Sequence, residues 1–348
     1  MNTRRAAAAM AVALAGACAV FARPAVATAP GKNGLIAFSR YRFVNNPVRK
    51  EIWVSNPDGS DPRQITHAPA NNLDSDPSWA PGGSRLVFSR CAPLNGSLCD
   101  GQQSIWVVNA DGTHPRMLTP PCRSKTLTPS AECPQDGQAV YSREGQIAAT
   151  RFTSVPGIAI GDGNFRHVHE LFPFGSKPGA PDVDAFAWSP DGKQLAFTVH
   201  NDNSKRFKPV GGRAIFVVNT DGTGLHRITP WKLNAGGLGE LAWSPDGGRI
   251  LFHPIGESLD DPNLSSGDLY SIRPNGTGLE QLTHLSAGVQ LGSYSPDGKQ
   301  IVFATTSGAI AGAGSDFPDV FVMNADGSGM KAVTRTKNWE GTPSWGAA

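Results

Sequence analysis

Short apolar runs alternate along the chain with turns rich in glycine and proline, and the alternation recurs as a recognisable phrase. In Ala187–Phe197, Trp188 ends one apolar run, Ser189–Gly192 form a polar segment and Leu195 belongs to the next run. Proline presets φ for a turn and glycine adopts positive φ at no steric cost, so the phrase predicts two strands joined by a tight turn. Further copies lie at residues 243–247 and 294–298, and a degenerate copy lies at 79–83.

A second recurring block combines a β-branched and aromatic run, an Asp-Gly or Asn-Gly pair and a short run that ends in threonine. Its first copy is Ile52–Gly59 with Ile65–Thr66. Such runs favour strands and such pairs favour hairpin turns, so each block predicts two more strands. The copies begin at residues 52, 105, 158, 215, 269 and 320. The copy at 158 is eroded, and the turn phrase before it is either Gln135–Gly137 or Arg143–Gly145.

The two patterns together give four strands in each period of 51 to 57 residues, which predicts an all-β, six-bladed β-propeller. The first unit is split between the two ends of the chain. Gly31–Arg40 matches only the back half of the phrase, and Thr342–Gly346 supplies the front half. We therefore expect the N-terminal strands to pair with the C-terminal strand and close one domain over residues 31–348. A linear β-solenoid is the alternative, but it needs no split unit.

Composition agrees with a protein of strands and turns. The 348 residues include 40 glycines and 28 prolines, and the formal net charge is +2. This small charge provides no basic surface for nucleic acid, so we expect no nucleic-acid partner. No apolar run of membrane-spanning length follows the N-terminal segment, so we expect no transmembrane segment in the mature chain.

The first 29 residues have the pattern of a signal peptide. Arg4 and Arg5 form a positive region, Ala6–Phe21 is apolar and Ala25–Ala27 is a small-residue cleavage site, which predicts cleavage after Ala27. We therefore expect an exported protein, located in the periplasm, the cell envelope or the medium. The arginine pair leaves the general secretory and twin-arginine routes open. Acylation at Cys18 is a further alternative.

Four cysteines remain after the signal peptide, and they lie within 43 residues of one another. An even, clustered set in an oxidising compartment indicates disulfides, although four cysteines allow three connectivities. We expect the local pairs Cys91–Cys99 and Cys122–Cys133. A zinc site is less favoured because neither spacing resembles a Cys-x-x-Cys pair.

The combination of Trp-Ser-Pro-Asp-Gly-Lys with Ile-x-Val-x-Asn-x-Asp-Gly resembles the TolB-like, WD-repeat-like propeller repeat. The resemblance covers about residues 31–348 and is clear in five of six repeats. It implies a propeller of six four-stranded blades that binds another protein. TolB-like proteins place a small α/β domain before the propeller, whereas here only the signal peptide precedes the first strand, so a stand-alone exported member is expected.

Acidic residues stand three to five positions before the aromatic residue of several phrases. In the predicted fold they gather around one mouth of the central channel, where walls of low dielectric constant would favour a cationic group, a metal ion or a basic peptide segment. The alternative is that they cap their own loops through side-chain hydrogen bonds. These candidate ligand-binding residues are Asp74, Asp76, Asp184, Glu240 and Glu340.

Other conspicuous residues have structural explanations. The Asp-Gly pairs lack the Asp-x-Asp-x-Asp-Gly spacing of a calcium loop, and Asn275 replaces aspartate in one copy, so they indicate hairpin turns. His167 and His169 share one strand face but lack an evident third metal ligand. The recurring aromatic residues predict packing between blades. These are Trp79, Trp188, Trp243, Tyr294 and Trp345.

The sequence contains no Gly-x-Ser-x-Gly elbow, phosphate loop or dinucleotide fingerprint. We therefore expect no catalytic residues and no cofactor, and the leading hypothesis is a monomeric, non-catalytic scaffold that binds a protein, a peptide or an envelope polymer. A hydrolase or lyase that acts on a glycan or peptide in the channel is the second hypothesis. A structural envelope protein is the third. Specificity should lie in the inserts 126–144, 201–212, 232–239 and 256–267.

Overall fold

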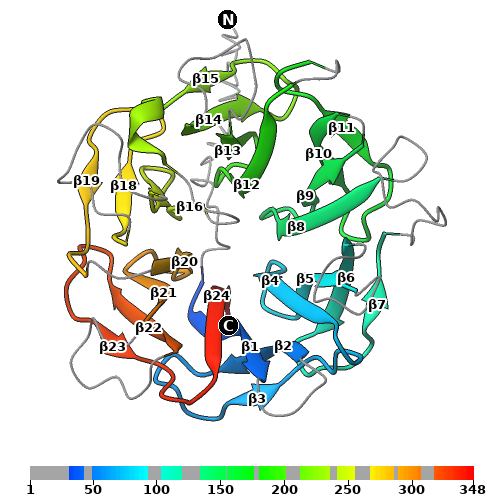
Figure 1. The fold of residues 1–348 in the computed structure, drawn as a ribbon, viewed down its shortest axis with the longest axis vertical. Coiled ribbons are helices and arrows are strands. Elements are labelled where there is room, and N and C mark those ends of the chain that lie inside the picture. Colours follow the sequence, from blue (N-terminus) through cyan, green and yellow to red (C-terminus); the bar gives the residue numbers. More distant parts are fainter. Residues whose placement is uncertain are drawn as a thin grey trace, which may run out of the picture.

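Strands form where the repeated phrases predict them, and together they build an all-β propeller (Figure 1). The computed structural model describes residues 31–42, 49–92, 103–119, 134–153, 155–175, 180–200, 212–235, 241–254, 267–285, 289–306 and 317–348. Within these segments the only helix is a 3-10 turn, Trp231–Leu233. None of the described helical structure is long and apolar enough to span a bilayer.

Four of the sheets contain four consecutive antiparallel strands each. The first comprises β8 (Gln135–Tyr141), β9 (Ile147–Phe152), β10 (Pro156–Gly161) and β11 (His169–Leu171). The second comprises β12 (Asp182–Trp188), β13 (Gln194–His200), β14 (Arg213–Asn219) and β15 (His226–Arg227). The third comprises β16 (Ala242–Trp243), β17 (Ile250–Phe252), β18 (Tyr270–Ile272) and β19 (Glu280–Gln281). The fourth comprises β20 (Val289–Tyr294), β21 (Gln300–Thr306), β22 (Pro318–Asn324) and β23 (Lys331–Ala332).

The remaining sheet has eight strands and contains both ends of the described chain. Its C-terminal strand pairs antiparallel with its N-terminal strand, with Trp345 opposite Ile36. A single parallel pair, Lys50 with Leu73, joins its two halves. One half comprises β24 (Trp339–Ala347), β1 (Asn33–Arg42), β2 (Arg49–Ser55) and β3 (Arg63–Gln64). The other comprises β4 (Leu73–Trp79), β5 (Arg85–Cys91), β6 (Gln103–Asn109) and β7 (Arg116–Met117).

The Ser-Pro-Asp-Gly phrase forms the turn between the first and second strands of a sheet. In the copy between β12 and β13, the Gly192 amide donates to the Ser189 carbonyl at 2.9 Å, and the Ser189 hydroxyl donates to Asp191 at 2.6 Å. Gly192 has a φ of +66°. Glycine is needed here because a side chain at positive φ is strained.

The Asp-Gly pairs form the turns between the third and fourth strands, which confirms the turn interpretation. One Asp221 carboxylate oxygen accepts both the Thr223 amide, at 2.9 Å, and the Thr223 hydroxyl, at 2.6 Å. These hydrogen bonds lower the pKa of Asp221 because they favour its charged form. Asn275 makes the same two contacts with Thr277, so a full negative charge is not required.

The structure decides which turn belongs to the eroded repeat. Gln135–Gly137 lies within β8, and the chain reverses at Ser142–Gly145, where the Gly145 amide donates to the Ser142 carbonyl at 3.1 Å. The second half of the proposed insert 126–144 is therefore mostly an inner strand. Residues 126–133 of that insert, and residues 201–211, 236–239 and 256–266 of the other proposed inserts, lie outside the described residues.

The hydrophobic core lies between neighbouring sheets, as expected for a propeller. Figure 1 shows β4, β8, β12, β16, β20 and β24 nearest the centre, with the shorter fourth strands at the periphery. Phe197 on β13 and Phe216 on β14 stack with ring centroids 6.1 Å apart and pack in one cluster with Trp188 and with residues of β9 and β10. Neighbouring sheets thus bury their apolar faces against each other.

Candidate functional site

The inner strands share an irregularity near one edge of the propeller. In the pairings β4–β5, β8–β9, β12–β13, β20–β21 and β24–β1, the register shifts by one extra residue on the inner strand. Such β-bulges re-aim side chains and often lie at the rims of closed sheets. We call the edge at which β4 and β8 begin, and at which β5 and β9 end, the entry edge.

Four of these bulges contain a non-glycine residue with positive φ. The values are +54° at Asp76, +46° at Gln138, +31° at Ala185 and +45° at Thr342. Positive φ is uncommon outside glycine and is a true outlier for a β-branched residue such as threonine. Backbone strain of this kind persists only where the surrounding structure enforces it, and it is concentrated at functional sites.

Hydrogen bonds hold these bulges, either between adjacent sheets or between the two halves of the eight-stranded sheet. The Asp76 amide donates to the Thr342 hydroxyl at 3.4 Å, and the Ala185 amide donates to the Gln138 side-chain oxygen at 3.1 Å. The Gln138 amide donates to the Ser89 hydroxyl at 2.8 Å. The bulges therefore form an arc along the entry edge, in which each of these strained residues is bonded to a neighbouring sheet or to the other half of its own sheet.

A cavity of about 490 Å³ opens beside this arc, and we call it the mouth cavity. The volume lies within the roughly 300–1,000 Å³ of typical ligand sites. Asp76 and Gln138 both line it, so two of the strained bulge residues face a space large enough for a small ligand. The complete lining is Tyr41, Lys50, Leu73, Ser75, Asp76, Ser89, Cys91, Gln103, Gln138, Thr150 and Phe152.

Tyr41 of β1 and Lys50 of β2 form one side of the mouth cavity, and Trp339 of β24 contacts both of them. Tyr41 meets Trp339 edge to face, with ring centroids 4.9 Å apart. The Lys50 ammonium lies 5.1 Å from the Tyr41 ring and 5.0 Å from the Trp339 ring. Burial, followed by the nearby Asp76 carboxylate, raises the pKa of the Tyr41 phenol. The phenol therefore stays neutral at physiological pH.

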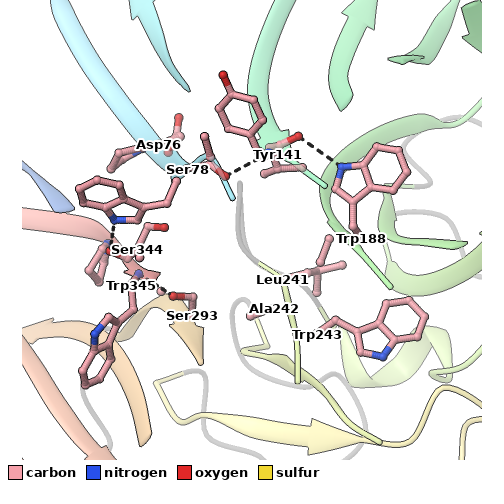
Figure 2. A pocket seen from close by; sticks show the side chains of 18 of the residues that line it. Asp76, Ser78, Tyr141, Trp188, Leu241, Ala242, Trp243, Ser293, Ser344 and Trp345 are labelled. Atoms are coloured by element: carbon pink, nitrogen blue, oxygen red, sulfur yellow. Dashed lines mark hydrogen bonds between the residues drawn. The ribbon is translucent and has the colours of Figure 1, made fainter. Parts of the chain in front are cut away.

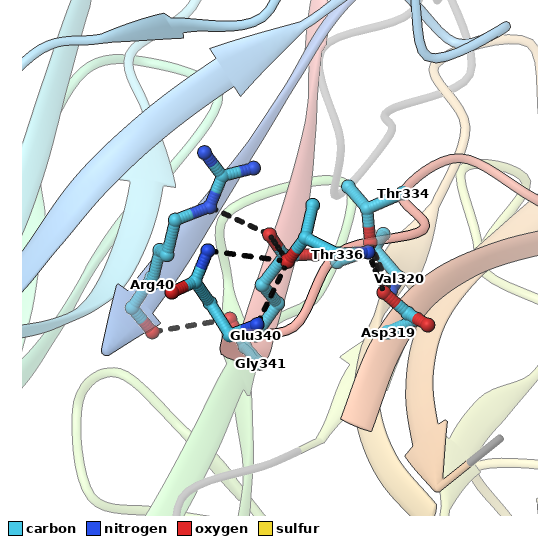
Figure 3. A network of polar contacts seen from close by, with 9 residues as sticks. Arg40, Asp319, Val320, Thr334, Thr336, Glu340 and Gly341 are labelled. Carbon is cyan, nitrogen blue, oxygen red and sulfur yellow. Dashed lines mark hydrogen bonds and ion pairs between the residues drawn. The ribbon is translucent and has the colours of Figure 1, made fainter. Parts of the chain in front are cut away.

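The structure places two of the predicted acids in the interior. Asp74 is 0% exposed and receives two hydrogen bonds from the Arg90 guanidinium, at 2.6 and 2.8 Å. Glu340 is likewise 0% exposed and accepts from Arg40 at 2.6 Å and from the Thr336 hydroxyl at 3.0 Å (Figure 3). Both carboxylates stand five residues before the aromatic of the phrase, and each contacts the arginine opposite it on the paired strand.

The arginine partners are the residues that sequence reasoning missed. Arg40, Arg90 and Arg151 each follow a buried segment of a second strand, and Arg151 binds Asp136 at 2.7 Å in the same arrangement. Arg40 and Arg90 also lie over indole rings, 4.0 Å from Trp53 and 4.4 Å from Trp106. The repeated sequence Phe-Ser-Arg at residues 38–40 and 88–90 could have indicated that Arg40 and Arg90 occupy equivalent positions.

The other predicted site residues are only partly described. Asp184 pairs through its backbone with Thr198, but its side chain and the whole of Glu240 lie outside the described residues. The grouping of all five acids at one mouth therefore stays a prediction. Cys91 is buried at the end of β5, and the other three candidates, Cys99, Cys122 and Cys133, also lie outside the described residues.

A second, smaller cavity of about 150 Å³ lies between the inner strands and is lined by four of the five predicted aromatic residues, all of them tryptophans (Figure 2). The Trp79 indole donates to the Ser344 carbonyl at 3.1 Å, and the Trp188 indole donates to the Val140 carbonyl at 3.2 Å. The Trp188 bond joins two adjacent sheets, and the Trp79 bond joins the two halves of the eight-stranded sheet. Both tryptophans therefore pack between neighbouring groups of four strands.

No group of three or more potential metal ligands occurs among the described residues. His167 is 88% exposed and lies 3.1 Å from Asp162, a residue of the turn after β10. His167 has a φ of +52° and precedes β11, so the expectation that the two histidines share a strand face is wrong. Both are exposed, which fits their interpretation as polar surface residues.

We expect His253 to make the stability of the fold depend on pH. Burial lowers the pKa of His253, which follows β17, from its ordinary 6.5 to about 4. Between the two pKa values the unfolded state binds more protons than the folded state. The contribution of His253 to the free energy of unfolding is therefore fully present above pH ~6.5 and is lost as the pH falls toward ~4. We expect this group to remove about 3 kcal/mol across that window.

The measurement is urea unfolding between pH 4.5 and 7.5 for the native chain and for His253→Gln. The variant is expected to lose less stability on acidification than the native chain. His169→Gln, which changes a solvent-exposed imidazole on β11, is the control and should leave the pH dependence unchanged. Equal pH dependence in all three proteins would contradict the assignment.

Comparisons with known proteins agree with the fold. No family model matches the chain. Among curated proteins, dipeptidyl-peptidase 5 of Porphyromonas endodontalis is 31% identical over 125 residues, which are 35% of this chain and 16% of that protein. The uncharacterized peptidase YuxL of Bacillus subtilis is 27% identical over 146 residues, which are 34% of this chain and 21% of that protein. The match therefore spans about a fifth or less of each curated relative.

Solved structures match over most of the chain. TolB from Acinetobacter baumannii has a TM-score of 0.61 and 17% identity, with 90% of this chain and 67% of that chain covered. Kuenenia stuttgartiensis hydrazine synthase has a TM-score of 0.63 and 14% identity, with 92% of this chain and 47% of that chain covered. At these identities the likeness establishes the fold: this chain has a TolB-like β-propeller.

Proposed function

We propose that this protein is a non-catalytic binding scaffold that takes a segment of a protein, a peptide or an envelope polymer into the mouth cavity. One observation carries the proposal. The cavity of about 490 Å³ lies beside strained, non-glycine bulge residues that are hydrogen bonded to a neighbouring sheet or to the other half of their own sheet. A pre-formed site of this kind loses little free energy to ordering when a ligand binds.

We infer that the propeller has six blades and is closed. The single parallel pair between Lys50 and Leu73 divides the eight-stranded sheet into two units, each with the same four-strand order as the other sheets. The pairing of β24 with β1 supports closure of the ring through both chain ends. Closure matters for function because it fixes the inner strands around the channel and so fixes the entry edge.

We also infer export, with cleavage after Ala27, because the N-terminal pattern is that of a signal peptide. The local disulfides Cys91–Cys99 and Cys122–Cys133 belong to this proposal, since they require an oxidising compartment. We expect a monomer in the periplasm, the envelope or the medium.

A peptidase or other hydrolase role is the second candidate, and one finding favours it. The curated protein that is 31% identical over 125 residues is a dipeptidyl-peptidase. Hydrolysis of peptide substrates by the purified protein, lost on substitution of residues in the channel, would promote this candidate over binding alone.

Capture from a cell-envelope extract is expected to show the binding role. The native protein should retain a partner that the double variant Asp76→Asn/Gln103→Ala loses, because both side chains line the mouth cavity. Asparagine tolerates positive φ, so the substitution at position 76 preserves the bulge. The readout is the bound fraction, measured by mass spectrometry.

Gln300→Ala is the matched control. Gln300 begins β21 directly after its turn, and antiparallel strands place this end opposite the entry edge. Capture by the native protein and the control, but not by the double variant, would support the proposal. Equal capture by all three proteins would show that the partner binds outside the mouth cavity.

A further inference from the structure

The mouth cavity contains polar groups that the fold leaves available for a ligand. Gln103 makes no side-chain hydrogen bond within the described structure, and Gln138 uses its side-chain oxygen for Ala185 but leaves its amide hydrogens unused. Asp76 accepts one hydrogen bond from Ser75, at 2.9 Å on one carboxylate oxygen. The mouth cavity is therefore lined by both hydrogen-bond donors and hydrogen-bond acceptors.

The charges of the lining balance. Among the described residues that line the mouth cavity, Lys50 and Asp76 are the charged ones, and they carry opposite signs. The other polar lining groups are amides, hydroxyls and a phenol that burial keeps neutral. Lys50 would repel a strongly cationic ligand, and Asp76 would repel a strongly anionic one. The lining therefore favours a neutral ligand.

Apolar surface complements these polar groups. Tyr41 and Phe152 contribute rings, and Leu73 contributes an aliphatic side chain. Such a lining suits a molecule with an apolar ring face and a perimeter of hydroxyls or amides, since aromatic faces cover the former and mixed hydrogen-bonding groups satisfy the latter. A purely apolar ligand would leave the Gln103, Gln138 and Asp76 groups desolvated without partners, which costs free energy.

We propose that the mouth cavity binds a neutral saccharide unit of a polymer, with Asp76 accepting from sugar hydroxyls and Gln103 and Gln138 hydrogen bonding to hydroxyl or acetamido groups. This saccharide proposal rests on the proposed binding function and specifies the class of ligand that is bound. The cavity of about 490 Å³ lies within the range of ligand sites and leaves space for sugar rings rather than for a folded domain.

Binding of the full-length mature protein to immobilised tetrasaccharides tests this. The neutral probes are glucose and N-acetylglucosamine tetramers of different linkage, and the charged probes are tetralysine and tetraglutamate. At least one neutral saccharide is expected to bind. Gln103→Ala should weaken that binding about fivefold and Asp76→Asn about tenfold, whereas Gln300→Ala should leave it unchanged.

The outcomes separate the ligand class from the binding function. Binding of tetralysine alone, abolished in Asp76→Asn, would keep the mouth cavity as the site and overturn the saccharide. Binding of no neutral saccharide, or saccharide binding that neither cavity variant changes, would also overturn the inference. Far-ultraviolet circular dichroism of each variant shows whether it has folded, and Gln103→Ala is the decisive variant because Gln103 is exposed.

Discussion

Replacing Arg90 with methionine is expected to destabilise the protein by about 3–5 kcal/mol, because it leaves the Asp74 carboxylate buried without its counter-charge. Asp74 is fully buried on β4, and both of its oxygens accept from Arg90 on β5, at 2.6 and 2.8 Å. The strands are paired at this position, so the ion pair is also a cross-strand contact. Urea unfolding monitored by tryptophan fluorescence gives the free energy of unfolding.

The double variant Asp74→Leu/Arg90→Met distinguishes the cause. Removing both charges eliminates the uncompensated carboxylate, and buried pairs replaced by apolar residues of similar volume are often neutral or stabilising. The double variant should therefore be more stable than Arg90→Met alone. Glu280→Gln is the control, since this carboxylate is 54% exposed in its pair with Arg249 and should change stability by less than about 1 kcal/mol. Additive losses in the double variant would contradict the argument.

Replacing Trp345 with alanine is expected to cost about 3–5 kcal/mol, the usual range for a buried tryptophan. Trp345 is 1% exposed and packs with Ile36 of β1 and with Val302 and Val320 of the neighbouring sheet. Its indole donates to the Gly34 carbonyl at 3.1 Å, and its backbone amide donates to the Ser293 hydroxyl at 2.9 Å. The loss thus weakens both the β24–β1 pairing and the contact with the next sheet.

Trp345→Phe is the informative comparison. It keeps most of the packing and removes the indole hydrogen bond, so it should cost less than the alanine variant. Thermal and urea unfolding of both variants measure the difference. A loss below about 1 kcal/mol for Trp345→Ala would show that the β24–β1 contact does not limit stability.

Part of the candidate site could be predicted from the sequence. Asp76 was a predicted ligand-binding residue and does line the mouth cavity, and Asp74 and Glu340 were grouped with it because all precede the same aromatic position. The bulge separates them: the residue three positions before the aromatic lies at the strained turn of the strand, whereas the residue five positions before it faces an arginine on the paired strand.

The glutamines of the site gave no comparable sequence signal. Gln103 opens an outer strand and Gln138 lies in an eroded repeat, and neither belongs to a recurring motif. Their common position depends on how adjacent sheets pack, because Gln138 lies on β8 and Gln103 on β6. Contacts between sheets are non-local, so spacing along the chain does not reveal them.

The sequence by itself determined the strands, the turns and the repeat of this protein, since these depend on local chemistry. Proline and glycine fix the turns, aspartate or asparagine bonds its own hairpin, and β-branched and aromatic runs favour strands. Only the tertiary structure decided which turn the eroded repeat uses, which acids are buried against arginines and where a cavity opens. These features depend on strand register, on one-residue bulges and on packing between sheets, which bring together residues far apart in the chain.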